Sequence, residues 1–166
     1  MRVPLSESSY TPTIRVATAA DIPAMTAIIN QAFALEKSFI SGDRTSHADL
    51  AEHMATGPFL VLEESGELVG CVWTEPRGER GYIGMLAIRV DRQGCGFGRR
   101  LMTAAEEALR EQGCIWADIC VVSLRTELLP LYRGWGYAES GVVESPTDFL
   151  ERLLRPAHLI RMSKPL

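Results

Sequence analysis

A glycine-rich segment set between an apolar segment and an amphipathic one constrains the fold of this chain more than any other feature. Residues 81–90 (GYIGMLAIRV) are apolar nearly throughout, as expected of a central strand that is buried on both faces. The glycine-rich segment 91–98 (DRQGCGFG) follows, and apolar residues then recur along one helical face until Gly113. Residues 115–122 (IWADICVV) again have the composition of a strand. This order of strand, loop, helix and strand predicts a right-handed βαβ unit with two parallel strands.

Periodic patterns elsewhere predict the elements that surround this unit. From the apolar patterns and turn residues we expect further strands at 13–17, 59–62, 67–73, 135–143 and 158–162. Helical spacing and capping residues predict helices at 22–33, 47–55, 126–134 and 145–154. The first dozen residues are polar and rich in proline and serine. We therefore expect residues 1–12 to form a flexible tail and residues 13–166 to form a single domain.

Length and charge exclude several classes of protein. At roughly 100–200 residues per domain, the 166 residues form one domain with a full-sized core. The 17 basic residues are outnumbered by 21 acidic ones, so the chain lacks the basic excess of a nucleic-acid-binding protein. No apolar run approaches the ~18 residues of a membrane span, and the N-terminus lacks the apolar core of a signal peptide. We expect a soluble, cytoplasmic protein that binds neither nucleic acid nor membrane.

The cysteines and histidines do not have the spacing of metal ligands. The four cysteines contain no CxxC pair, and His47 and His53 are six residues apart, which does not place two ligands on one helical face. We expect no metal site, and we expect the cysteines to be small buried side chains.

The glycine-rich segment has the chemistry of an anion-binding loop. Glycines let the backbone approach a ligand closely, and the helix that follows presents free N–H groups with a partial positive charge. Arg99 and Arg100 stand at the start of that helix, where two cations oppose the helix dipole and an anionic ligand would explain them. The alternative is a glycine-rich turn with two solvated arginines. We favour a pyrophosphate site, because the segment connects a buried strand to a helix.

Spacing separates this segment from two familiar phosphate-binding loops. A Walker A loop requires Gly-Lys-Ser/Thr, whereas Arg99 and Arg100 follow Gly98 here. A dinucleotide fingerprint requires G-x-G-x-x-G directly after the first strand and an acid about twenty residues further on. The glycines here are spaced G-x-G-x-G, Asp118 falls inside a predicted strand, and the chain has one βαβ unit where a dinucleotide needs two halves. Neither loop matches this chain.

The pattern Gln-x-x-Gly-x-Gly, formed by Gln93, Gly96 and Gly98, resembles the acyl-CoA-binding motif of the GNAT superfamily of N-acetyltransferases. Three further segments are similar to that family in the same order along the chain, namely 14–18 with Asp21, 85–88, and 131–137 (LYRGWGY). The resemblance implies a GNAT-like acyl-CoA N-acyltransferase fold. That fold is an α/β (α+β) domain with a mixed, mostly antiparallel sheet of six to seven strands, splayed at the central parallel pair, with helices on both faces.

This resemblance implies that acetyl-CoA is the co-substrate. In the family, a bulge in the strand that resembles 85–88 opens a gap for the pantetheine arm, and an N–H of the segment of Leu86 and Ile88 would point toward the acetyl carbonyl. The pyrophosphate would be held mostly by main-chain N–H groups of the glycine loop. The implied cofactor-binding residues are Leu86, Ala87, Ile88, Gln93, Gly94, Cys95, Gly96, Phe97, Gly98 and Arg99.

The resemblance also implies that Tyr132 is the catalytic general acid, because the family places a tyrosine near the thioester sulfur. A phenol with an ordinary pKa of ~10 is protonated at pH 7 and can donate its proton to a departing thiolate. The expected reaction is transfer of the acetyl group to a primary amine by direct attack in a ternary complex. Cys95 lies in the phosphate loop, so we expect no covalent acetyl-enzyme on it. The alternative is a non-catalytic acyl-CoA-binding sensor or interaction module of the same fold.

Two departures from the family pattern leave the general base and one cofactor contact open. Tyr82 stands where some members have a glutamate, and Glu75 and Glu79 could act as bases only through water. Arg125 stands where an asparagine often contacts the cofactor.

The acceptor pocket is expected to be formed by residues 36–44 and 144–156. Acids there would attract a cationic amine, although none is assigned a role: Glu36, Asp43, Glu144 and Asp148. The acceptor is either a small-molecule amine or a peptide amine, and the resemblance implies that a homodimer is common among such proteins.

Overall fold

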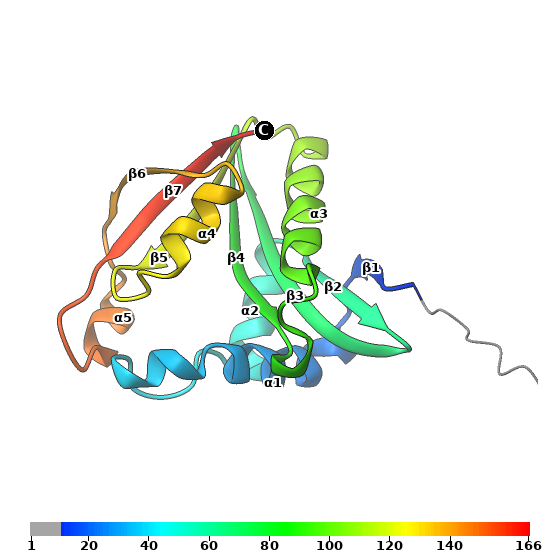
Figure 1. Cartoon of the computed structure of the whole chain (residues 1–166), viewed down its shortest axis with the longest axis horizontal. Helices are drawn as coiled ribbons and strands as arrows, with labels where there is room; N and C mark the ends of the chain where they lie inside the picture. Colours follow the sequence, from blue (N-terminus) through cyan, green and yellow to red (C-terminus); the bar gives the residue numbers. More distant parts are fainter. Residues whose placement is uncertain (1–10) are drawn as a thin grey trace, which may run out of the picture.

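The computed structural model describes residues 11–166 and contains a seven-stranded mixed sheet (Figure 1). The strands are β1 (Thr13–Val16), β2 (Phe59–Glu64), β3 (Glu67–Arg77), β4 (Arg80–Ile88), β5 (Trp116–Val122), β6 (Ala138–Val143) and β7 (Leu159–Pro165). The α-helices are α1 (Ile22–Ala32), α2 (His47–Thr56), α3 (Phe97–Glu111), α4 (Leu128–Gly134) and α5 (Thr147–Arg152). Three short 3-10 helices are η1 (Ala19–Asp21), η2 (Ala34–Ser38) and η3 (Val90–Arg92). Most of the expected tail of residues 1–12 lies outside the described residues.

The helices and strands expected from the sequence are present, with shifted ends. β3 runs on to Arg77 and β7 to Pro165, beyond the predicted ends at residues 73 and 162. The predicted start of β6 at residue 135 is wrong. β6 begins at Ala138, because Gly136 has a φ of 95° and forms a turn after α4. The mixed α/β fold itself is confirmed.

A hydrogen-bonded carboxylate, that of Asp21, sets the start of the first helical segment. The N–H of Thr18 donates to Asp21 Oδ2 at 2.7 Å, and the guanidinium of Arg15 donates to both carboxylate oxygens at 2.8 Å. The hydrogen bond from Arg15 lowers the pKa of Asp21 to about 2. This ionised carboxylate connects β1 to η1 and α1.

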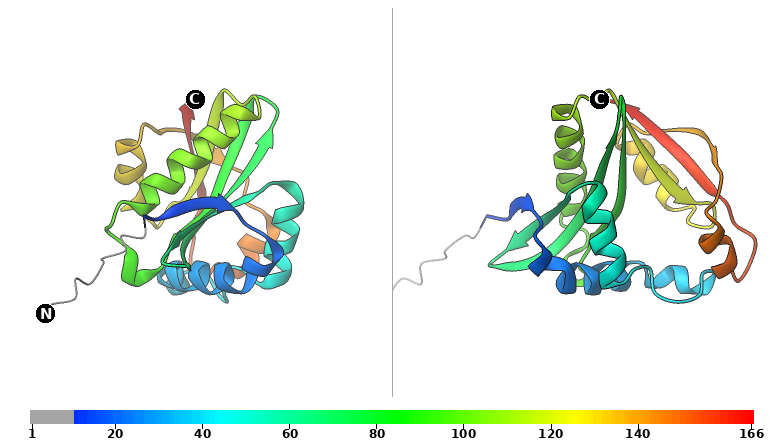
Figure 2. Two further views of the ribbon diagram at one scale, coloured as in Figure 1. Left: turned by 90° about the vertical axis from the view of Figure 1, so that its right-hand side faces the viewer. Right: turned by 180° about the vertical axis from the view of Figure 1, so that it is seen from behind.

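The sheet is split between its two parallel strands, in the order β1-β2-β3-β4-β5-β7-β6. β4 and β5 pair only over residues 80–82 and 116–118, where Arg80 Nε donates to Asp118 Oδ2 at 2.6 Å. Beyond this point the strands diverge and form a V (Figures 1 and 2). β4 keeps its antiparallel partner β3, and β5 keeps its antiparallel partner β7. Each diverging strand therefore has an unpaired inner edge.

A β-bulge in β4 lies within this diverging part. Cys71 pairs with Ala87 and Trp73 pairs with Gly84, so Met85 and Leu86 together oppose one residue of β3. Met85 has a φ of 51°, a left-handed conformation that is uncommon for a residue with a side chain. The bulge expected in residues 85–88 is therefore present.

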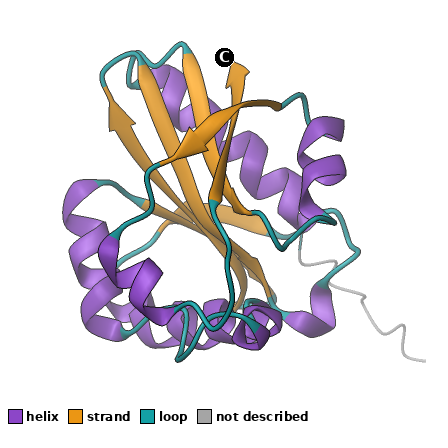
Figure 3. Cartoon of the chain, turned by 90° about the vertical axis from the view of Figure 1, so that its left-hand side faces the viewer, coloured by secondary structure: helices purple, strands orange, loops and turns teal. Residues whose placement is uncertain are grey.

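Helices cover both faces of the sheet, and each face has its own hydrophobic core. α1 and α2 pack on one face through Met25, Ile29 and Leu50, against Phe59 and Val61 of β2. In the left view of Figure 2, α3 lies across the other face, and Figure 3 shows the strands in front of that helix from the opposite side. α3 contributes Leu101, Met102, Ala105 and Leu109 to the second core, which also includes side chains of α4.

β4 is less buried than its apolar composition predicts. Ile83 and Ala87 are buried, whereas Tyr82, Leu86 and Ile88 are half-buried. The expectation of burial on both faces is wrong for this strand, because part of it borders a cavity instead of a neighbouring strand.

A buried carboxylate connects α3 to the end of β7. Glu106 is 3% exposed and accepts hydrogen bonds from the Tyr137 hydroxyl at 3.0 Å and from Lys164 Nζ at 3.0 Å. Burial, followed by the charge of Glu106, raises the pKa of Tyr137. Because the buried charge is paired, this cluster positions α3 beside the split of the sheet.

Candidate functional site

A cavity of about 1140 Å³ lies between the diverging strands β4 and β5. Its walls are formed by residues 82–88 of β4, residues 119–122 of β5, the glycine loop, the start of α3, and α4. Pockets for drug-sized ligands typically occupy about 300–1,000 Å³, so this cavity is large enough for a long ligand.

All of the residues predicted to bind the cofactor border this cavity, with the exception of Cys95. They are Leu86, Ala87, Ile88, Gln93, Gly94, Gly96, Phe97, Gly98 and Arg99. Cys95 is exposed, and its thiol contacts the carbonyl oxygen of Gln93 at 3.9 Å. The structure thus brings the bulged strand and the glycine loop to one site and leaves the Cys95 side chain outside it.

The glycine loop adopts a backbone conformation that requires glycine. Gly94 and Gly96 have φ angles of 78° and 80°, and Gly96 is the residue that caps α3. A Cβ built on either residue would have no heavy atom within 4 Å. Within residues 11–166, the N–H groups of residues 96–99 make no hydrogen bond. These free donors at the start of a 15-residue helix form a suitable site for an anion.

The two arginines that follow the loop have different environments. Arg99 borders the cavity and lies over the ring of Trp135, 5.6 Å from its centroid. Its Nη1 atom is buried without a hydrogen-bond partner in the described chain, and Glu106 Oε1 is 3.7 Å away. Arg100 instead donates from Nη2 to the carbonyl oxygen of Pro12 at 2.9 Å and does not border the cavity. The expectation that one anion explains both arginines is therefore wrong for Arg100.

Tyr132, the predicted general acid, borders the same cavity from α4. Its ring makes edge-to-face contacts with Trp135 and Tyr137, at centroid distances of 5.5 and 6.2 Å. Burial raises the pKa of Tyr132 to about 12, so the phenol is protonated at neutral pH. Its hydroxyl makes no hydrogen bond with any other residue of the described chain, which leaves it available to a ligand.

Three aromatic side chains pack together beside the cavity, and two of them border it. The rings of His53 and Trp73 are 4.6 Å apart, and the rings of Trp73 and Tyr82 are 5.7 Å apart. Trp73 Nε1 donates to the carbonyl oxygens of His53 at 3.1 Å and Gly57 at 3.2 Å. His53 and Tyr82 border the cavity, and His53 Nδ1 is 2.8 Å from the carbonyl oxygen of Asp49. Burial raises the pKa of Tyr82, so Tyr82 presents a protonated phenol where some family members have a glutamate.

Arg125, at the position where the family often has an asparagine, joins two distant parts of the chain. Its Nη1 donates to Glu36 Oε1 at 3.2 Å across 89 residues of sequence, and its Nε donates to Glu127 Oε1 at 2.6 Å. Burial raises the pKa of Glu36, while Arg44 and Arg125 act in the opposite direction. Both Arg125 and Glu36 border the cavity, so Arg125 connects η2 to the segment that follows β5.

The two segments expected to form the acceptor pocket lie side by side. Ile40 forms an isolated β-bridge with Leu153, and the N–H of Ser41 donates to the carbonyl oxygen of Arg152 at 2.9 Å. Of the acids noted in these segments, Glu36, Asp43 and Asp148 border the cavity, and Glu144 does not.

The glutamates considered as distant bases are not part of the site. Neither Glu75 nor Glu79 borders the cavity. The Glu75 carboxylate accepts a hydrogen bond from Arg77 Nε at 2.6 Å.

Several cavity residues were not singled out by the sequence patterns as parts of the site. His53 and Cys120 were not predicted as site residues, whereas Arg44 belongs to the segment 36–44 that is expected to form the acceptor pocket. These side chains reach the cavity because α2, the 39–46 loop and β5 come together in three dimensions, which no local spacing encodes.

Within residues 11–166, no cluster of His, Cys, Asp and Glu side chains has an arrangement that could hold a metal ion. Over the same residues, none of the helices combines the length and the apolar character needed to cross a membrane.

Curated proteins and solved structures resemble this chain. It is 32% identical over 96 residues to the mycothiol acetyltransferase of Streptomyces coelicolor, an alignment that covers 57% of this chain and 29% of that protein. It is 30% identical over 95 residues to the mycothiol acetyltransferase of Cellulomonas flavigena, covering 51% of this chain and 27% of that protein. The aligned part is therefore less than a third of the length of these relatives.

Solved structures share the fold at low sequence identity. A ribosomal-protein-alanine N-acetyltransferase from Brucella melitensis has a TM-score of 0.72 at 24% identity, covering 93% of this chain and 99% of that one. A GNAT family acetyltransferase from Elizabethkingia anophelis, solved with acetyl-CoA bound, has a TM-score of 0.74 at 18% identity, covering 93% and 98%.

The acetyltransferase (GNAT) family model matches residues 24–137, a stretch that extends from α1 through the glycine loop and Tyr132 to the turn before β6. This stretch is more than half of the 166 residues. The chain therefore belongs to the acetyltransferase (GNAT) family.

Proposed function

We propose that this protein binds acetyl-CoA as co-substrate and transfers its acetyl group to a primary amine by direct attack in a ternary complex. One observation carries the proposal: a single cavity between β4 and β5 is bordered by the bulged strand, the glycine loop and the Tyr132 phenol. The acceptor class includes small-molecule and peptide amines. A cytoplasmic location, a homodimer and a single domain over residues 13–166 stay predictions.

The residues around the cavity suit coenzyme A. The free N–H groups of residues 96–99 are donors for a pyrophosphate, and Arg99, whose Nη1 lies 3.7 Å from Glu106 Oε1 without a hydrogen bond, adds positive charge beside them. The unpaired inner edge of β4 offers backbone groups to an extended pantetheine arm. When bound, coenzyme A supplies the activated acetyl group as a thioester.

Substituting Gly96 by alanine is expected to weaken coenzyme A binding. A Cβ at a φ of 80° costs roughly 1–2 kcal/mol. If the loop relaxes away from this conformation in the free protein, coenzyme A binding must restore it, and its affinity should fall by about tenfold. Gly113→Ala is the matched control, because Gly113 follows the other end of α3 with a φ of 86° and equally open surroundings. Isothermal titration calorimetry should show weaker binding only for Gly96→Ala, while thermal unfolding should show similar destabilisation of both variants. If Gly96→Ala and the wild-type protein bound coenzyme A with equal affinity, the loop would not be part of the proposed site.

Tyr132 is proposed as the general acid that protonates the departing thiolate. Its pKa of about 12 keeps the phenol protonated at neutral pH, so the proton is present for donation to the sulfur as the carbon–sulfur bond breaks, and no protein group competes for its hydroxyl among the described residues.

The cysteine that borders the cavity is not suited to form a covalent acetyl-enzyme. Cys120 borders the cavity, and burial raises the pKa of its thiol. A protonated thiol is a poor nucleophile, and Cys95 lies outside the cavity. Direct attack by the amine therefore fits the site better than a two-step transfer.

His53 is proposed to accept the proton of the incoming amine, directly or through water. The contact of its Nδ1 with the Asp49 carbonyl oxygen favours the tautomer with hydrogen on Nδ1 and a free lone pair on Nε2. His53→Gln is expected to lower kcat/KM by about 10²-fold or more with a strongly basic amine and by less with a weakly basic one. His47→Gln is the control, because His47 is exposed on the same helix and does not border the cavity. The same loss with both amines would argue against a role in proton transfer.

The activity is tested by thiol release from acetyl-CoA against a panel of small amines and peptides. Turnover with at least one amine is expected. Coenzyme A binding without turnover across the whole panel would favour a non-catalytic sensor or interaction module.

A further inference from the structure

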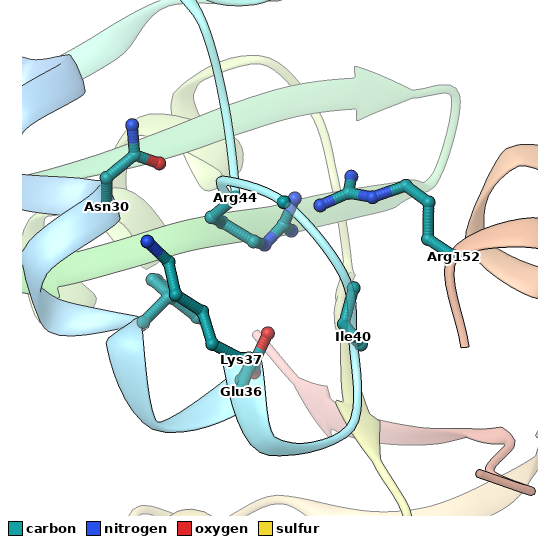
Figure 4. A pocket seen from close by; sticks show the side chains of 8 residues that line it. Asn30, Glu36, Lys37, Ile40, Arg44 and Arg152 are labelled. Carbon is teal, nitrogen blue, oxygen red and sulfur yellow. The ribbon is translucent and has the colours of Figure 1, made fainter. Parts of the chain in front are cut away.

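Arg44 is a charged side chain that neither the fold nor the proposed chemistry uses. It borders the main cavity and the small adjoining pocket near Asn30 and Lys37 (Figure 4). Its guanidinium lies over the ring of Phe33, 5.4 Å from the centroid, a contact that orients its flat face. Within residues 11–166 it makes no hydrogen bond or ion pair, so its N–H donors are not used by the protein.

The charge of Arg44 acts on two groups that border the cavity. Burial raises the pKa of Glu36 and of Tyr82, both of which border the cavity, and the positive charge of Arg44 opposes this rise in each. Arg44 is therefore near both groups, and its side chain is also exposed to solvent.

A second arginine is fixed beside the first. Arg152 donates from Nε to the carbonyl oxygen of Ser41 at 2.9 Å and from Nη2 to that of Asp43 at 2.5 Å. Figure 4 shows the guanidinium ends of Arg44 and Arg152 pointing toward one another. Two like charges held close together repel each other, and an anion placed against them would offset this repulsion.

The acids around the cavity do not neutralise this pair. Glu36 pairs with Arg125 at 3.2 Å, and Asp43 pairs with Lys37 at 3.0 Å. Asp49 accepts a hydrogen bond from the Thr45 hydroxyl and lies beside His53. Asp148 also borders the cavity and forms no ion pair with Arg44 or Arg152 in the described chain. Within residues 11–166 no acid forms an ion pair with Arg44 or Arg152, and Glu36 is the acid on which the charge of Arg44 acts.

The geometry points to an acceptor amine that also carries a carboxylate, such as a free amino acid, with the carboxylate bound by Arg44 beside Arg152. This inference rests on the proposed function and specifies its acceptor. Arg44 presents paired N–H donors that match a carboxylate. This inference is the reverse of the expectation that acids attract a cationic amine here. A polyamine or an aminoglycoside would bring further positive charge to two arginines.

The test compares the twenty amino acids with their C-terminal amides, and with a polyamine, in the thiol-release assay with acetyl-CoA. The wild-type protein is expected to use at least one free amino acid with a higher kcat/KM than its amide. In Arg44→Gln this ratio should fall by about 10- to 100-fold, as expected for loss of a charged hydrogen bond. Arg110→Gln should leave the ratio unchanged, because Arg110 is exposed on α3 and does not border the cavity.

The possible outcomes separate this inference from the proposed function. The inference would be overturned if the wild-type protein used the amides or the polyamine at least as fast as the free amino acids. It would also be overturned if the ratio were unchanged in Arg44→Gln. Either result would leave the acetyltransferase function standing. Absence of thiol release with every amine, with coenzyme A still bound, would overturn both.

Discussion

Tyr132→Phe is expected to lower kcat by about 10²- to 10⁴-fold while leaving the dissociation constant of coenzyme A unchanged. The substitution removes one hydroxyl that borders the cavity and makes no hydrogen bond within residues 11–166. The ring and its edge-to-face contacts with Trp135 and Tyr137 are retained, so the fold should not be disturbed. Steady-state thiol release and calorimetry on the same preparation measure both quantities.

Tyr137→Phe provides a matched control for Tyr132→Phe. The Tyr137 hydroxyl donates to the buried Glu106 carboxylate at 3.0 Å, so its loss should lower the free energy of unfolding by about 1–2 kcal/mol and leave kcat nearly unchanged. Equal kcat values for Tyr132→Phe and the wild-type protein would show that no proton passes through Tyr132.

The pH dependence gives a second measure of the same role. Tyr132 acts in its protonated form, which is the form below its pKa of about 12. Loss of activity through ionisation of this phenol is therefore expected only as the pH approaches that value, and any fall in kcat closer to neutral pH must come from another group.

Gly57→Ala is expected to destabilise the protein more than any other single glycine-to-alanine change. A Cβ at Gly57 would lie 2.0 Å from the carbonyl oxygen of Thr74, and this backbone atom cannot move aside as a flexible side chain would. Forcing α2 away from β3 should cost about 3 kcal/mol, or roughly 10 °C in Tm for a protein of this size. The Gly57 carbonyl also accepts a hydrogen bond from Trp73 Nε1, so the packing of Trp73 against His53 should be disturbed too.

Gly134→Ala is the control for this substitution. Gly134 is the last residue of α4, and nothing lies within 4 Å of a Cβ built on it. Because alanine favours helix, Gly134→Ala should leave the free energy of unfolding unchanged or raise it by up to about 1 kcal/mol. Thermal and urea unfolding measure both variants, and an unaltered Tm for Gly57→Ala would show that α2 and β3 do not approach as closely as described.

Local patterns predicted the parts of the fold that depend on neighbouring residues. The apolar strand, the glycine spacing of Gly94, Gly96 and Gly98, and the helical period after them specify a βαβ unit without reference to the rest of the chain. The bulge at Met85 and the role of Tyr132 came only from resemblance to a family. Nothing in the local pattern of residues 85–88 distinguishes a bulged strand from a regular one.

Features that depend on distant residues could not be predicted from spacing. The insertion of β7 between β5 and β6 is decided by pairing across the whole C-terminal part of the chain. The ion pair of Arg125 with Glu36 spans 89 residues, and in the sequence Arg125 was visible only as a departure from a family pattern. The approach of Arg152 to Arg44 likewise depends on the packing of α5 against the 39–44 segment.

The split between β4 and β5 also affects how the sheet avoids unwanted association. An unpaired strand edge on a protein surface is a template for aggregation, because a foreign chain can add to it as another strand. Here two such edges face each other across an internal space, with α3, α4 and the 39–46 segment around them. The separation that creates room for a ligand therefore turns these edges toward a cavity of the same domain, and they are not outer edges of the sheet.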